Sequence, residues 1–146
     1  MQNYILIALA AGAVLPVQAL INGRLSVGLG SAFMAGNISF FVATLGLLVA
    51  QLVMQQPLPS GAQASAVPLW AWFGGLLGAI YVVGAIVSVG AIDTTSAICL
   101  IIAGQIAAAL VVDQFGLLSA ASHPLTLLRL FGAGLVVTGA IIVLRG

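Results

Sequence analysis

The long apolar stretches of the sequence contain or border several uncharged polar residues, and five of them are candidates for binding a ligand: Gln18, Asn22, Asn37, Tyr81 and Gln105. In an apolar medium, each such side chain needs a hydrogen-bonding partner or a water-filled cavity. Gln18 and Asn22 are four residues apart and so share one face of a helix, which Pro16 can kink just before them. We expect the five residues to line a cavity for a small molecule. The alternative is that they only join helices, at about 0.6 kcal/mol for each hydrogen bond.

Four charged residues form two candidate ion pairs near the ends of apolar runs. Arg129 and Asp113 make one pair, and Arg24 and Asp93 make the other. Pairing lowers the cost of removing each charge from water. The pairs are therefore either structural or gates that break and form as a cavity opens. Arg145, at the end of the last apolar run, is expected to extend its guanidinium to a polar boundary.

No other combination of residues suggests catalysis or metal binding. His123 and Cys99 are the only histidine and cysteine, and no cluster of His, Cys, Asp and Glu has the spacing of metal ligands. The sequence also shows no nucleophile beside a base and no paired carboxylates, so we predict neither an enzyme nor a cofactor. A net charge of +1 without a basic patch excludes a nucleic-acid partner.

These residues are expected to be held on helices in a lipid bilayer. Of the 146 residues, 63% are hydrophobic and 3% are charged, and the mean hydropathy is +1.33. An ordinary soluble domain is about 45–50% apolar and about 25% charged. This chain has too few charged residues to cover a surface that faces water, so its solvent must be lipid.

Five apolar runs are long enough to cross a bilayer core about 30 Å thick as helices. We therefore predict one all-α integral membrane domain over residues 1–146. The first span is preceded by no Lys or Arg, which favours a retained helix over a cleaved signal peptide. We expect the first span to end in a turn at 22–24. Ser31 is expected to cap the second span, and residues 55–68 are expected to form one long loop. The predicted spans are roughly 4–20, 31–54, 70–89, 96–112 and 125–144.

Small residues at four-residue spacing, such as Gly74 and Gly78, predict close helix packing within the bundle. Trp70 and Trp72 begin the third span and are expected to anchor it at the membrane interface rather than to bind a ligand.

An odd number of spans places the two termini on opposite sides of the membrane. Arg129 then lies on the side of the N-terminus, while Arg24 and Arg145 lie on the other side. Because basic residues on loops set orientation, this near balance permits insertion in both orientations. Two oppositely oriented copies would form an inverted repeat, with a substrate site near the midplane between them.

Motifs along nearly the whole chain also carry a family resemblance. They are Leu15–Leu25, Ile38–Phe40, Trp70–Gly75, Gly78–Val82, Gly104–Gln105, Asp113–Gly116, and His123–Leu125 with Arg129. Together they resemble the YdcZ-like family of the drug/metabolite transporter superfamily. The resemblance implies a multi-pass protein of the bacterial inner membrane, equivalent to one half of a ten-helix transporter and working as an antiparallel dimer by alternating access. The turn after the third span, at 88–91, departs from the family pattern.

The placement of charge also bears on the substrate. A proton-coupled exporter of cations typically holds a carboxylate near the midplane, but the first span has none, and Asp93 and Asp113 are peripheral. The sequence therefore disfavours a proton/cation antiporter and leaves open a neutral, zwitterionic or anionic metabolite, whose anionic group would meet Arg24 or Arg129. Two assemblies stay open, a homodimer and a heterodimer with a related chain. The alternative function is a non-transporting or regulatory subunit that needs an oppositely oriented partner.

Overall fold

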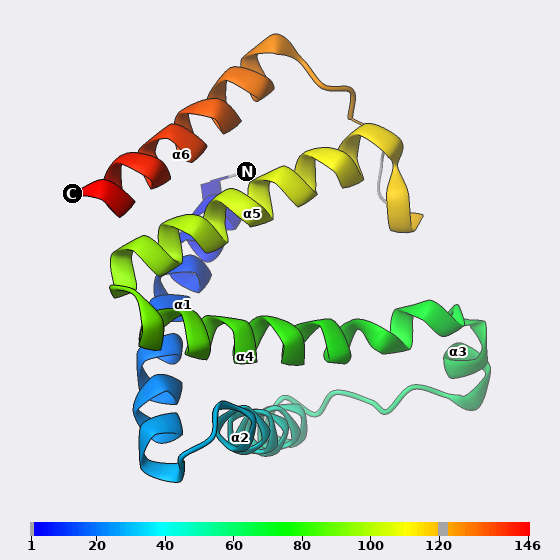
Figure 1. The fold of residues 1–146 in the computed structure, drawn as a ribbon. Coiled ribbons are helices and arrows are strands. Elements are labelled where there is room, and N and C mark those ends of the chain that lie inside the picture. The colour runs from blue at the N-terminus through cyan, green and yellow to red at the C-terminus, as the bar shows by residue number, and fades with distance from the viewer. Residues whose placement is uncertain (1, 120–122) are drawn as a thin grey trace. The chain divides into compact units, whose positions relative to one another are not determined.

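A computed structural model of the chain describes residues 2–119 and 123–146 (Figure 1). Every regular element in these residues is a helix, and five spans are long and apolar enough to cross a membrane. The all-helical fold with five membrane-capable helices is therefore confirmed. The elements are α1 (Gln2–Leu29), α2 (Ala32–Val53), α3 (Gly61–Ala66), η1 (Leu69–Phe73), α4 (Gly74–Ala91), α5 (Thr94–Phe115), η2 (Leu117–Ser119) and α6 (Leu127–Arg145).

The first helix is longer than predicted. The expected turn at 22–24 is wrong, because α1 continues as regular helix to Leu29 and ends where Gly30 adopts a φ of +67°. Only glycine takes this left-handed conformation without strain, so Gly30 is the residue that stops the helix. Asn22 is 5% exposed, and its side chain is bonded to another helix rather than to a local turn. Asn22 therefore serves packing between helices.

Side-chain caps define the other helix starts. Ser31 caps α2 as predicted, since its Oγ accepts a hydrogen bond from the N–H of Met34. Ser60 and Gln63 form a reciprocal capping box, so the predicted loop at 55–68 contains the short helix α3. Thr126 caps α6.

The chain divides into two compact units, residues 1–87 and residues 88–146. In the first unit, α1, α2 and most of α4 pack around a small core of Ala35, Val82 and Ile86. In an 18-residue apolar window of each candidate membrane span, only 6–17% of the residues are buried. Large apolar side chains on the outside are expected when lipid rather than water is the solvent.

The second unit contains α5 and α6, which pack against each other as a hairpin (Figure 1). The α5 helix ends at Gly116, whose φ of +58° is the left-handed conformation of a C-terminal cap. The Gln114 side chain then accepts a hydrogen bond from the N–H of Leu125 at 2.7 Å. The end of α5 thus fixes the approach of the chain to α6.

Candidate functional site

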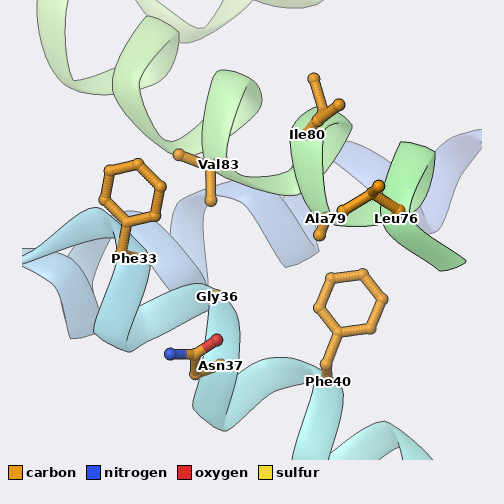
Figure 2. Close-up of a pocket in the computed structure, with 8 residues that line it drawn as sticks. All are labelled: Phe33, Gly36, Asn37, Phe40, Leu76, Ala79, Ile80 and Val83. Atoms are coloured by element: carbon orange, nitrogen blue, oxygen red, sulfur yellow. The ribbon is translucent and has the colours of Figure 1, made fainter.

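A cavity of about 340 Å³ lies between α2 and α4 in the first unit. Figure 2 shows the side chains of both helices around it. Small-molecule sites have volumes of about 300–1,000 Å³, so the cavity can hold a compact ligand. Its lining residues are Phe33, Gly36, Asn37, Phe40, Leu76, Ala79, Ile80 and Val83.

Helical periodicity explains why these residues meet. The α2 residues recur at intervals of three or four positions, as do the α4 residues, so each set forms one helix face. Two glycines bring the helices together. A Cβ atom on Gly36 would lie 3.3 Å from Val83 Cγ2, and one on Gly78 would lie 3.4 Å from the ring of Phe40. The two close approaches are about one helical turn apart along α2.

The cavity is apolar except for one amide. Asn37 is its only lining residue with a polar side chain, and none of the lining residues is charged. Asn37 is exposed, and within the described chain its side chain has no hydrogen-bond partner. A primary amide both donates and accepts hydrogen bonds. The site can therefore offer apolar contact, two phenyl rings and one neutral polar group.

Three other predicted residues gather at a second, much smaller cavity. Gln18, Asn22 and Tyr81 line a space of about 10 Å³ between α1 and α4. This is about the minimum volume that holds one water molecule, so the space as described does not admit a substrate. Beside it, Asn22 Nδ2 donates a hydrogen bond of 3.1 Å to Ser39 Oγ of α2. This polar junction joins three helices of the unit.

The two cavities involve opposite faces of α4. Ala79, Ile80 and Val83 line the larger cavity, while Tyr81 and Ala85 line the smaller one. At 100° per residue these two sets lie on different sides of the helix. The α4 helix is therefore the element that both sites share.

Gln105 belongs to α5, in the second unit. Its side chain is exposed and has no hydrogen-bond partner among the described residues. Its predicted place in a cavity with Gln18 and Tyr81 stays a prediction.

Of the two predicted ion pairs, Arg129 and Asp113 are in contact. Arg129 Nη2 donates to Asp113 Oδ2 at 2.5 Å, and Nη1 donates to the carbonyl of His123 at 3.1 Å. The N–H of His123 in turn donates to the carbonyl of Asp113 at 2.8 Å. These bonds connect the end of α5, the connecting segment and the start of α6. In the described parts of the chain, no three His, Cys, Asp or Glu residues could hold a metal ion.

Asp93 has a different contact from the one predicted. It caps α5, where its carboxylate accepts a 2.9 Å hydrogen bond from the N–H of Ser96. The Ser96 side chain and then its N–H hold the pKa of Asp93 below its ordinary value of 3.8. Arg24 is exposed and lies in the other unit, so the pair of Arg24 with Asp93 stays a prediction.

A family model described as "Putative inner membrane exporter, YdcZ" matches residues 3–142. The chain belongs to this family. Neither the curated proteins nor the solved structures contain a match to the chain. Membership in the YdcZ family, together with five membrane-capable helices, makes this a multi-pass protein of the inner membrane. It also supports a membrane transporter rather than an enzyme.

For this member of the YdcZ family, the sequence prediction identified one residue of the larger cavity, Asn37, and missed its apolar walls. Phe33 and Phe40 flank Asn37 at helical spacing, and Ile80 and Val83 stand opposite on α4. The available signal was the pair of aromatic residues one turn on either side of a polar residue. That signal is weak because lipid-facing positions carry the same apolar residues.

Proposed function

We propose that the chain exports a small molecule by alternating access as an antiparallel dimer, and that the α2–α4 cavity is its substrate site. The observation that carries the proposal is the Asn37 amide, which has no hydrogen-bond partner among residues 2–119 and 123–146 and lies in a ligand-sized cavity between two membrane-capable helices. An uncompensated amide in hydrocarbon costs several kcal/mol, so it needs a polar ligand, water or a protein partner. Membership in an exporter family supports a transported ligand as the partner.

A second copy is supported by the polar groups that this chain leaves exposed. Asn37 and Gln105 are both exposed within candidate membrane spans. Side chains of this type avoid lipid and face other helices or a wet cavity. A copy of opposite orientation would cover Gln105, enclose the cavity that Asn37 lines, and complete an inverted repeat with an even number of helices. The near balance of the three arginines permits that orientation.

The α4 helix is the proposed moving element. One of its faces lines the substrate cavity, and the other packs at the polar junction of Gln18, Asn22 and Tyr81. A small rotation of α4 would widen one space as it narrows the other. In this mechanism the Asn22–Ser39 bond holds α1 to α2 while α4 moves.

The charged residues are proposed as gates at the two membrane boundaries. Arg129 with Asp113 closes one end of the α5–α6 hairpin. Arg24 with Asp93 would act at the opposite boundary in another state of the cycle. Gln105 would join the cavity from α5 in the assembled dimer.

A ligand screen followed by transport tests the proposal. The purified full chain is screened against a metabolite and drug library for compounds that raise its thermal stability, since a ligand of the folded state does so. Hits are retested with Asn37→Leu and with Ala43→Leu, which alters an exposed α2 alanine outside the cavity. We expect hits to stabilise Asn37→Leu less than the unmodified chain, to stabilise Ala43→Leu equally, and to show counterflow in liposomes. Hits without counterflow, or counterflow that Asn37→Leu leaves unchanged, would contradict the proposal.

Orientation tests the dimer separately. Each copy receives one cysteine, in place of Gln2, in a Cys99→Ser background and is labelled in vesicles by a membrane-impermeant maleimide. We expect about half of the copies to react from each side. One fixed orientation would instead support a subunit that needs an oppositely oriented partner.

A further inference from the structure

The lining of the α2–α4 cavity bears on the chemical class of its ligand. It has two phenyl rings, those of Phe33 and Phe40, and one amide, Asn37, but no charged side chain. Figure 2 shows both rings on the α2 side, one on either side of Asn37. The polar side-chain atoms that line the cavity therefore belong to one neutral amide, that of Asn37.

We propose that the cavity selects an uncharged, largely aromatic molecule with a single hydrogen-bonding group. This inference rests on the proposed function, because it takes the same cavity as the substrate site. A charged ligand would lose its hydration there and meet no counter-ion, a cost that neutral ligands avoid. An aromatic ligand can instead stack against Phe33 and Phe40 while its polar group bonds to Asn37.

Other occupants fit these residues less well. A lipid acyl chain would fill the apolar walls but would leave the Asn37 amide unpaired. A permanent cation could lie over a phenyl ring, but that attraction is much weaker than the cost of removing a charge from water. The pairing of one amide with two rings therefore favours a ligand that is apolar at one end and polar, without charge, at the other.

Ala79 gives a direct way to test the cavity. It lines the α4 wall and has a short side chain, so Ala79→Leu would extend three further carbon atoms into the space. Ala43→Leu makes the same change on α2, outside the cavity. The two variants separate loss of ligand space from a general effect of a larger apolar side chain.

The experiment compares three ligands with one ring system and different charge. The neutral probe is 2-naphthalenemethanol, the cation is 2-naphthylmethylammonium and the anion is 2-naphthoate. Binding to the purified full chain is measured by equilibrium dialysis against protein-free micelles, which corrects for partition into detergent. We expect the alcohol to bind at least about 10-fold more tightly than either charged probe.

The variants then assign the binding to the site. Ala79→Leu should weaken alcohol binding at least about 10-fold, whereas Ala43→Leu should leave it unchanged. Asn37→Leu should weaken the alcohol about 2- to 10-fold, the worth of one hydrogen bond, and should not weaken 2-ethylnaphthalene.

The outcomes separate this inference from the proposed function. Tighter binding of a charged probe, with loss in Ala79→Leu, would overturn the neutral class but retain the cavity as a ligand site. Failure of all three probes to bind would also overturn the inference. If a library hit then showed counterflow that depended on Asn37 and Ala79, the proposed transport function would stand, and only the inferred class of neutral aromatic ligands would be wrong. Binding of the alcohol that neither cavity variant changes would place the ligand elsewhere and contradict both.

Discussion

Breaking the Arg129–Asp113 pair gives a prediction whose size follows from the structure. The two side chains are 39% and 29% exposed, so solvent screens them and the pair should contribute at the level of a surface ion pair, about 0.2–1 kcal/mol. Arg129 also donates to the carbonyl of His123, a bond that Asp113 does not share. We therefore expect Asp113→Asn to destabilise the chain by up to about 1 kcal/mol and Arg129→Gln by about 1–2 kcal/mol.

The double variant is the decisive measurement. Once Arg129 is replaced, Asp113 has lost its ionic partner, so adding Asp113→Asn should cost almost nothing further. The free energy of unfolding is measured by titration with sodium dodecyl sulfate in mixed micelles, and Arg145→Gln, at the other end of α6, is the matched control. Fully additive losses would refute the pair as a stabilising contact. If the pair is also a gate, the double variant should recover transport that either single variant loses, and a double variant less active than both would contradict the gate.

Three further predictions concern packing, hydrogen bonding and pH. Gly36→Ala should be less stable than Gly84→Ala by about 1–3 kcal/mol in the same titration. Both changes gain helix propensity, but the Cβ on Gly36 would lie 3.3 Å from a side-chain carbon on α4, whereas Gly84 has open space around it. Asn22→Ala and Ser39→Ala should each cost about 0.6–1.7 kcal/mol and should couple in a double-mutant cycle, whereas independent effects would contradict the bond. Because the fold lowers the pKa of Asp93, the ionised carboxylate stabilises the folded state at pH values above 3.8, the ordinary pKa. Stability in acid-titration melts should therefore fall as the pH drops below 3.8. Asp93→Asn should remove this contribution to the pH dependence.

The helices could be predicted from sequence because lipid imposes a simple requirement. A membrane span must satisfy its backbone hydrogen bonds as a helix of about 20 apolar residues, and five such runs are visible. Ser31 was also predictable, since its side chain can accept from the first turn of α2. The end of α1 was not, because Asn22 and Arg24 resemble a polar turn until the bond from Asn22 to Ser39 of another helix is known.

The site was only partly predictable, for a related physical reason. Polar residues such as Asn37 and Tyr81 stand out in an apolar sequence, and the structure places both at cavities. Phe33 and Phe40 do not stand out, because apolar side chains suit both a ligand cavity and the lipid. The Arg129–Asp113 pair was predictable because two charges near one membrane boundary each gain from a partner.

Asn37 is proposed to face a substrate pathway rather than lipid. The test is the reactivity of Asn37→Cys, in a Cys99→Ser background, toward the uncharged and water-soluble reagent hydroxyethyl methanethiosulfonate, with Ala43→Cys on the same helix as control. A thiol reacts as the thiolate and so needs water, which a transport cavity supplies and hydrocarbon does not. We expect Asn37→Cys to react, to be protected by 2-naphthalenemethanol or a transported library hit, and Ala43→Cys to remain unmodified. Equal lack of reaction at both positions would mean that Asn37 faces lipid.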